Sequence, residues 1–344
     1  MDEFDESNEI RIVVLGAGGG GGNTINRLSK IQVTGAELAA VNTDAQDLKK
    51  LDENITKILI GSKLTRGLGA GGFPEIGMKA AEASKKELLD YLTGAHLIFL
   101  CAGMGGGTGT GSAPVLAEIG KEAGAIVVSI VTFPFKLERS RAEKAREGIS
   151  RLRKAADTVI VIDNNKLVDY VPNLPIDRAF LVADEVVTRA VKGITETIKA
   201  PSLINLDFAD IKSILCGGKV SVICVGEGSG PDKVEAAVKN TLEHPLLDVD
   251  YRGAKGGLIH ITGGPDMTIG DANRIGELIT NEFDPNANVM WGARVDPRLQ
   301  DTYEIISIAT GVKSQNLLGP YDRERLDEPY LYTPEYCELK IRDI

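Results

Sequence analysis

The chain has 344 residues, 43% of them hydrophobic, which is enough to bury the cores of two packed domains. Its formal net charge of −10 argues against general nucleic-acid binding and against direct adsorption to anionic lipid, because both require a basic surface. The four cysteines form no Cys-x-x-Cys pair and the three histidines lie far apart in sequence, which argues against a zinc site.

The first half of the chain begins with an acidic, polar segment and continues as alternating strands and helices. Residues 1–9 lack the pattern of a signal peptide, and no apolar run in the chain reaches membrane-spanning length, so we expect a cytoplasmic protein without membrane insertion. The expected strands are residues 10–15, 38–41, 58–60, 97–101, 126–131 and 158–162. Their alternation with amphipathic helices is typical of a parallel sheet covered on both faces, which binds ligands at the carboxyl ends of its strands.

The first strand runs directly into a glycine-rich segment at residues 16–22, after which a helix is expected from Asn23. The pattern Gly-x-Gly-x-x-Gly is satisfied from Gly16 to Gly21, and Asp44 follows the second strand, as in dinucleotide-binding folds. In a run so rich in glycine this match is nearly automatic. An NAD-dependent oxidoreductase therefore remains one hypothesis at this point.

A second glycine-rich segment, at residues 103–111, is the most informative in the chain. It reads Gly-Met-Gly-Gly-Gly-Thr-Gly-Thr-Gly, follows an apolar strand and precedes Pro114, which predicts a helix that starts near this proline. Glycines let backbone N–H groups approach a ligand closely, and a helix N-terminus adds unpaired donors and a positive dipole end. The combination predicts a phosphate-binding site.

A third loop of this kind, Gly-Leu-Gly-Ala-Gly-Gly at residues 67–72, does not fit a dinucleotide site. A dinucleotide fold uses one such loop for one pyrophosphate, whereas three loops after successive strands indicate a longer phosphate chain, as in a nucleoside triphosphate. The Walker pattern is absent, because Gly217-Gly218-Lys219 is followed by Val220. We therefore do not expect a P-loop enzyme.

The second half of the chain predicts a long helix and a second, smaller α/β domain. Apolar residues at helical spacing span residues 176–199, and Pro201 ends this helix. Trp291 lies in an apolar, strand-like run and is expected in the core. The remaining expected elements are strands at residues 220–225, 257–262 and 305–310, helices at residues 232–242 and 268–282, and a polar extension at residues 318–344.

The three loops, their order and the segments between them resemble FtsZ, the tubulin-like GTPase family of prokaryotic cell division. The resemblance runs from about residue 10 to residue 315 and includes the family signature at residues 103–111. Two further family motifs are Asn42-Thr43-Asp44-Ala45-Gln46 and Asn205-Leu206-Asp207-Phe208-Ala209-Asp210. Segments that resemble the second archaeal paralogue of the family are residues 137–141, 163–167, 202–205 and 260–264.

This resemblance implies an α/β fold, with a tubulin-like parallel-sheet GTPase domain joined by a long central helix to a smaller α/β C-terminal domain. The implied segments are a flexible N-terminus (1–9), a GTP-binding domain (10–175), the central helix (176–200), a C-terminal GTPase-activating domain (201–316) and a tail (317–344). The implied ligands are GTP or GDP, with Mg²⁺ held through phosphates and waters.

The resemblance also implies which residues bind the phosphates, the metal ion and the ribose. The phosphates would be cradled by Gly19, Gly20, Gly103, Met104, Gly105, Gly106, Gly107, Thr108 and Gly109, and the γ-phosphate would be covered by Ala70, Gly71 and Gly72. Asn42, Asp44 and Gln46 would orient Mg²⁺ and its waters, because oxygen ligands suit this hard ion. Pro134, Glu138 and Arg141 would meet the ribose and phosphates. The chain has Glu-Arg-Ser-Arg where most relatives have Glu-Gly-x-x-Arg, so Arg139 is an alternative to Arg141.

The implied base-reading residues are Asn23, Asn164 and Asp184, with Phe180 stacking on the base. A carboxylate can accept hydrogen bonds from both N1–H and N2–H of guanine, which adenine does not offer, and this favours GTP over ATP. Without the resemblance, Phe180 is typical of core packing and Asp184 of a solvated helix residue.

The implied catalytic residues are Asn205, Asp207 and Asp210. On their own, these residues indicate an acidic turn that caps a helix beginning near Phe208. In the resembled family this loop lies at the opposite end of the subunit from the nucleotide and completes the active site of the next subunit. Asp207 and Asp210 would polarise the attacking water, and Asn205 would help to position it. Such a head-to-tail contact does not close on itself, so it builds filaments.

The resemblance further implies partners and a cellular role. The partners would be copies of the chain itself, a second FtsZ paralogue and membrane-tethering division proteins at the division site, with no nucleic acid. A tubulin-like GTPase that sets cell shape is the alternative. The oxidoreductase hypothesis leaves the loops at residues 67–72 and 103–111 without a function.

Overall fold

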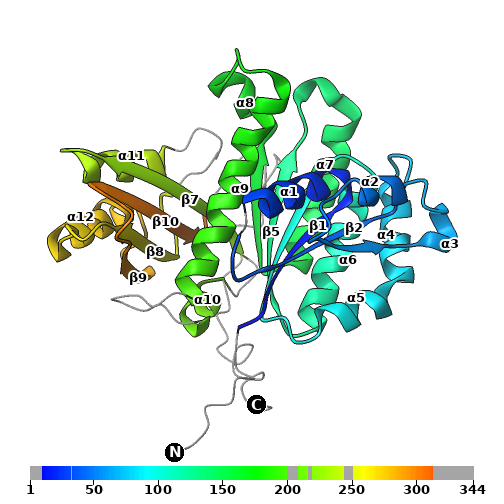
Figure 1. Cartoon of the computed structure of the whole chain (residues 1–344), viewed down its shortest axis with the longest axis horizontal. Coiled ribbons are helices and arrows are strands. Elements are labelled where there is room, and N and C mark those ends of the chain that lie inside the picture. The colour runs from blue at the N-terminus through cyan, green and yellow to red at the C-terminus, as the bar shows by residue number, and fades with distance from the viewer. Residues whose placement is uncertain (1–9, 32, 200–207, 216–218, 244–250, 313–344) are drawn as a thin grey trace, which may run out of the picture.

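The computed structural model describes residues 10–31, 33–199, 208–215, 219–243 and 251–312, and its N-terminal half is a parallel sheet with helices on both faces (Figure 1). Its strands, in sheet order, are β3 (Thr56–Leu59), β2 (Glu37–Asn42), β1 (Ile12–Ala17), β4 (Leu97–Gly103), β5 (Ile126–Phe133) and β6 (Thr158–Asp163). Neighbouring strands pair in parallel throughout, as the alternating pattern predicts. The sheet order reverses between β1 and β4, so the carboxyl ends of these two strands open a crevice.

Helices cover both faces of this sheet and create two apolar cores. Alternate residues of β1 point to opposite faces of the sheet: Val13 and Leu15 pack in one core, and Ile12 and Val14 pack in the other. A strand buried on both faces has no polar side, and this is why the strands appear in the sequence as continuous apolar runs. The helices are α1 (Gly18–Ile31), α2 (Ala45–Lys49), α3 (Ser62–Thr65), α4 (Pro74–Ala83), α5 (Lys85–Leu92), α6 (Thr108–Glu122), α7 (Arg139–Ala155) and α8 (Asn164–Tyr170).

Two helix starts differ from the sequence-based prediction. Helix α1 begins at Gly18 and not at Asn23, and α6 begins at Thr108, so that Pro114 lies inside it. Glycine occurs inside α1 because this helix packs closely on β4, where a Cβ at Gly21 would lie 2.2 Å from the carbonyl oxygen of Cys101. The glycines of these segments therefore serve helix packing as well as the loop that precedes each helix.

The long helix α9 (Ile176–Lys199) stands between the sheet and a smaller C-terminal domain, as Figure 1 shows. The C-terminal elements are α10 (Phe208–Leu215), β7 (Lys219–Ser229), α11 (Lys233–Leu242), β8 (Gly256–Gly263), α12 (Ile269–Thr280), β9 (Asn288–Val295) and β10 (Thr302–Thr310). Strand β10 pairs antiparallel with β7 and β8, and β9 pairs parallel with β8. Trp291 in β9, which was expected in the core, is only partly buried and packs against the core.

The two halves are joined by a narrow contact between strands and by α9. Among the described residues, strand β7 continues the first sheet through two register pairs, 158 with 219 and 159 with 220. Helix α9 lies so close to the C-terminal sheet that a Cβ at Gly193 would lie 1.8 Å from Cδ1 of Ile306. The C-terminal domain therefore contacts the first half both through the pairing of β6 with β7 and through packing against α9, the long helix that the sequence predicted.

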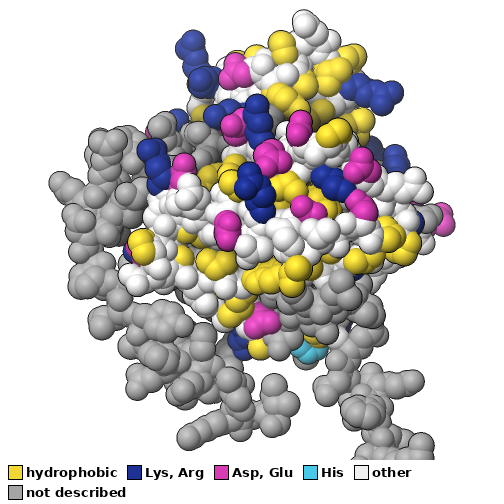
Figure 2. Space-filling view, turned by 90° about the vertical axis from the view of Figure 1, so that its left-hand side faces the viewer, with side chains coloured by type: hydrophobic (Ala, Val, Ile, Leu, Met, Phe, Trp, Pro, Cys, Tyr) yellow, Lys and Arg dark blue, Asp and Glu magenta, His cyan; other side chains and the backbone are white. Residues whose placement is uncertain are grey.

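On the face of the C-terminal domain in Figure 2, Lys and Arg side chains are interspersed with Asp and Glu. Within the described ranges, no helix is long and apolar enough to cross a membrane. The predictions for Asn205, Asp207, the N-terminal segment 1–9 and the tail 317–344 concern positions outside the described residues.

Candidate functional site

The first two glycine segments meet at the crevice between β1 and β4. A Cβ at Gly20 would lie 3.0 Å from Cα of Gly103, and a Cβ at Gly18, where φ is +69°, would lie 2.7 Å from the backbone N of Gly109. Only glycine allows two backbones to approach this closely. The contact places the N-termini of α1 and α6 side by side, which is a favourable site for an anion.

The third loop lies directly on the second. A Cβ at Gly107 would lie 2.9 Å from Cβ of Ala70 and 3.1 Å from the backbone N of Gly72. Gly71 and Gly72 have φ of +59° and +78°, and their N–H groups have no hydrogen-bond partner among the described residues. The structure thus brings the three predicted loops together and leaves backbone donors there for a ligand.

Three threonines hold this arrangement, and two of them were missed from the sequence. Gly105, with φ of +99°, donates its N–H to Oγ1 of Thr110 at 2.8 Å. Thr108, which was predicted, shares a hydrogen bond of 2.6 Å between its Oγ1 and that of Thr43. The bond ties the second loop to the end of β2. Both Thr43 and Thr110 lie within motifs of the resembled family, but the sequence predicted no role of its own for either of them.

The segment after β2 presents carboxylates to the loops. Asp44 caps α2, because its Oδ1 accepts from the backbone N of Gln46 at 2.8 Å, and a Cβ at Gly69 would lie 3.6 Å from its Oδ2. The Oδ1 of Asn42 accepts a hydrogen bond from the backbone N of Thr43 at 2.8 Å, and the side chain of Asn42 is buried. Asp47, which the sequence did not single out, lies beside Gly19, where a Cβ would be 3.8 Å from its Oδ2.

The segment after β5 and the start of α7 close the site on another side. Glu138 accepts from the N–H of Phe135 at 3.1 Å and pairs with Arg141 at 2.7 Å. Of the two candidate arginines, Arg141 is therefore the one paired with Glu138. Arg141 also lies against the second loop, because a Cβ at Gly105 would lie 2.8 Å from the carbonyl oxygen of Arg141. Pro134 is buried beside this segment.

The residues predicted to read a base gather where α1, α8 and α9 meet. Phe180 is partly buried and lies edge-on to Phe135, with ring centroids 6.0 Å apart. The Oδ1 atom of Asn164 is buried without a hydrogen-bond partner among the described residues. An unsatisfied buried oxygen is costly, so its presence points to a ligand that supplies the partner. Asn23 is exposed on α1.

Asp184 is buried and not solvated, contrary to what its residue type alone suggests. It is 8% exposed, accepts from Oγ1 of Thr24 at 2.7 Å and forms an ion pair with Arg27. Arg27 also donates to the carbonyl oxygen of Phe180, and burial lowers the pKa of its guanidinium. The ion pair and the hydrogen bond from Thr24 fix the orientation of the carboxylate, which suits an acceptor for a base.

Asp210 lies at the other edge of the sheet. Its helix α10 contacts the amino ends of the strands: Phe208 lies edge-on to His96, which directly precedes β4, with centroids 6.0 Å apart. Thr158, the first residue of β6, donates to the carbonyl oxygen of Leu215 at 3.3 Å. In Figure 1, α10 is accordingly at the lower end of α9 and α8 at its upper end.

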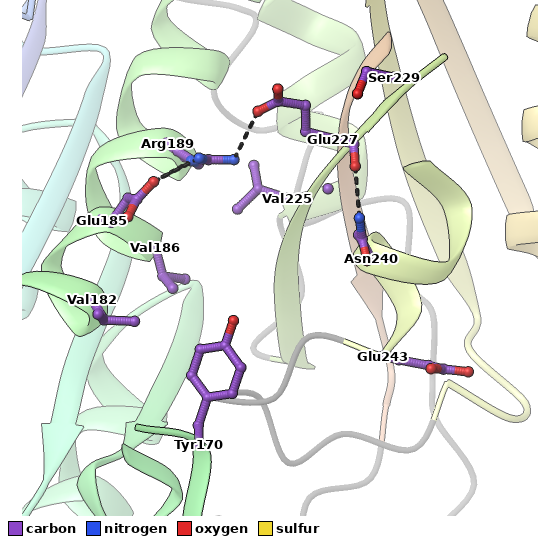
Figure 3. Close-up of a pocket in the computed structure, with 11 residues that line it drawn as sticks. Tyr170, Val182, Glu185, Val186, Arg189, Val225, Glu227, Ser229, Asn240 and Glu243 are labelled. Carbon is purple, nitrogen blue, oxygen red and sulfur yellow. Dashed lines mark hydrogen bonds and ion pairs between the residues drawn. The ribbon is translucent and has the colours of Figure 1, made fainter. Parts of the chain in front are cut away.

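A cavity of 420 Å³ lies elsewhere, between α9 and the C-terminal domain (Figure 3). Arg189 lies there between Glu185 and Glu227, with N–O distances of 2.6 and 3.6 Å, and Tyr170 and Glu243 line the cavity at greater distance from Arg189. None of its lining residues belongs to the glycine loops. This cavity is therefore separate from the candidate phosphate site.

Comparisons with known proteins match both halves of the fold. The family model "Tubulin/FtsZ family, GTPase domain" matches residues 11–172, and "FtsZ family, C-terminal domain" matches residues 219–313. "Cell division protein FtsZ 2" of Methanocaldococcus jannaschii is 62% identical over 318 residues, which cover 92% of this chain and 83% of that protein. The protein of the same name from Haloferax volcanii is 52% identical over 327 residues, which cover 95% and 82%. The solved structure "FtsZ dimer, empty (M. jannaschii)" has a TM-score of 0.81 and 46% identity, and covers 89% of each chain.

Proposed function

The chain belongs to the FtsZ family of tubulin-like GTPases, and we propose that it polymerises head to tail into the filaments of a cell-division ring. The three glycine loops of one subunit bind GTP, and the acidic segment before and within α10 of the next subunit completes the hydrolytic site. The names of the curated relatives support a role in cell division over one in cell shape.

The observation that carries this proposal is the position of Asp210 relative to the loops. The loops lie at the carboxyl edge of the sheet and α10 at the amino edge, so they are separated by the length of a strand. Seven residues of β4 at about 3.3 Å each give roughly 23 Å. No side chain spans that gap, so Asp210 reaches a phosphate only when a second copy stacks on the first.

Exposed apolar side chains at the carboxyl edge support such stacking. Large hydrophobic residues that would normally be buried are exposed in the segments that follow β3, β5 and β6 and at the start of α9. They are Leu64, Leu68, Phe73, Leu137, Val168, Tyr170, Leu174 and Leu181. A second subunit that covers this edge would remove them from water, which is the main driving force for association.

The loops suit a nucleoside triphosphate, and the base site suits guanine. Gly19, Gly20 and residues 106–109 offer N–H groups to the phosphates, and Gly71 and Gly72 offer two more where a third phosphate would lie. The N–H groups of Met104 and Gly105 are already donated to Thr132 and Thr110, so these two residues shape the loop. Asp184 supplies a charged acceptor for N1–H and N2–H of guanine. Asn164 supplies the buried amide, and Phe180 and Phe135 supply aromatic faces against which the base would pack.

The donor set supports a Mg²⁺ ion bound through the phosphates. Asp44 and Asp47 place carboxylates beside the loops, but no group of three such ligands occurs within the described residues. Mg²⁺ commonly keeps several waters and takes one or two carboxylates together with substrate phosphates. Bound in this way, the ion would neutralise phosphate charge, while Asp44 and Gln46 would orient its waters.

We extend the proposal to the partners and the domains. The chain would act at the division site in the cytoplasm with a second FtsZ paralogue and with membrane-tethering proteins, and residues 10–175, 176–200 and 201–316 would act as the GTP-binding domain, the central helix and the activating domain. The separate family matches on either side of α9 support this division of the chain.

GTP turnover measured against protein concentration, with sedimentation of the same samples, tests the proposal. We expect a rate per subunit that rises above a threshold concentration, together with GTP-dependent pelleting. A rate per subunit that does not change with concentration, with no protein in the pellet, would mean that each chain hydrolyses GTP alone.

A further inference from the structure

A lysine on α7 reaches the third glycine loop. The Nζ of Lys144 donates to the carbonyl oxygen of Gly72 at 2.8 Å and lies 5.6 Å from the ring centroid of Phe73. No sequence motif singled out Lys144. It lies one helical turn after Arg141, on the part of α7 that packs against the start of α6.

Besides Lys144, the second half of the loop is held by its packing on Gly107 and by the N–H of Phe73, which donates to the carbonyl oxygen of Ala70 at 3.0 Å. The first half of the loop is tied to the end of β2, because Gly69 donates to the carbonyl oxygen of Thr43 at 3.1 Å. Its second half bends through Gly71 and Gly72, both at positive φ, and Phe73 is 58% exposed. The contacts from Lys144 therefore add a side-chain anchor to the half of the loop that carries the free N–H groups.

We propose that Lys144 is a positioning residue that fixes Gly72 over the third phosphate and so sets the preference for GTP over GDP. The inference rests on the proposed binding of GTP by the three loops. A diphosphate would not reach Gly71 and Gly72, so the position of these N–H groups matters only for the triphosphate. The carbonyl of Gly72 accepts from an ammonium group, and such charge-assisted bonds are stronger than neutral ones.

The test measures binding of GTPγS and of GDP to the full chain below its assembly threshold, by competition against a fluorescent guanine nucleotide. Lys144→Met keeps the length of the side chain and removes the ammonium, and Lys144→Arg restores a cationic donor. Lys154→Met removes one positive charge from the exposed end of α7 and serves as the matched control. Phe73→Leu removes the ring beneath the ammonium and keeps the charge.

We expect Lys144→Met to weaken GTPγS binding about fivefold to tenfold with GDP binding unchanged, as for the loss of one charged hydrogen bond at a partly exposed site. Lys144→Arg should recover most of the loss, Phe73→Leu should show a smaller loss of the same kind, and Lys154→Met should bind like the wild type. Equal weakening of both nucleotides, or no change in either, would overturn the inference. A wild-type protein that binds neither nucleotide would instead overturn the proposed function.

Discussion

Replacing Asp210 by alanine separates GTP binding from GTP hydrolysis. At roughly 23 Å from the loops, the Asp210 carboxylate is well beyond the screening length of about 8 Å, so its charge does not affect the phosphates bound to the same chain. The affinity of the monomer for GTP should therefore stay within about twofold of wild type. Turnover should fall by roughly 10²-fold or more, the usual loss on removing an acid or base group.

Mixing two inactive variants tests whether Asp210 acts on the neighbouring subunit. The second variant is Gly105→Ala, in which a residue with φ of +99° gains a Cβ 2.8 Å from the carbonyl oxygen of Arg141, so the phosphate loop cannot keep its shape. In a random copolymer at equal concentrations, roughly a quarter of the contacts pair an intact phosphate site with an intact Asp210. GTPase activity should recover to about that fraction of wild type. If the two variants pellet together and show no more activity than each alone, the in-trans role of Asp210 is wrong.

Three further measurements test the base site, the glycine packing and a buried histidine. Asp184→Asn should lower the preference for GTP over ATP by roughly tenfold or more in competition binding, because the amide cannot accept from both guanine donors. Gly21→Ala should lower the free energy of unfolding by at least about 2 kcal/mol, because its Cβ would lie 2.2 Å from the carbonyl oxygen of Cys101. Gly276→Ala, which has open space around it in α12, should raise the free energy of unfolding by about 0.5–1 kcal/mol. Equal effects of the two variants in urea unfolding would contradict the packing argument. Burial lowers the pKa of His260 to about 4, so only the unfolded chain takes up a proton between that value and about 6.5, and stability is lost as the pH falls. From about pH 7 to about pH 5 the wild type should lose about 2 kcal/mol more than His260→Leu, and parallel losses in the two proteins would show that the ring is not kept neutral.

The strands were predictable because each is a short apolar run, and such runs follow from burial on both faces. Helix α9 was equally clear, since its apolar residues recur at helical spacing over the whole range later found, Ile176–Lys199. The two helix starts that were predicted wrongly, at Asn23 and near Pro114, lie at Gly18 and Thr108 in the structure, within glycine-rich segments. Glycine has no side chain to show periodicity, so the backbone contacts that extend these helices leave no trace in the sequence.

The site was predictable where its chemistry resides in the backbone. The three loops converge because parallel strands end at the same edge, and that convergence follows from strand order alone. The partners that hold the loops and the base site were not predictable, because Thr43, Arg27 and Lys144 acquire their roles from segments distant in sequence. Asp184 illustrates the point, since only the fold places it against Thr24 and makes it a buried carboxylate.

The third glycine loop offers a physical route from nucleotide state to filament stability. The segment that carries the free N–H groups of Gly71 and Gly72 also exposes Leu68 and Phe73, which are 78% and 58% accessible to solvent. If the two N–H groups bind the third phosphate, the same short loop fixes the apolar side chains that a second subunit would cover. Hydrolysis removes the anion that orders the loop. Each contact between subunits must then also offset the conformational entropy lost when the loop is fixed, so association becomes weaker. Because Lys144 holds this loop from α7, Lys144→Met should weaken assembly in GTP more than the loss of one surface charge, and comparing its threshold concentration with that of Lys154→Met measures the coupling.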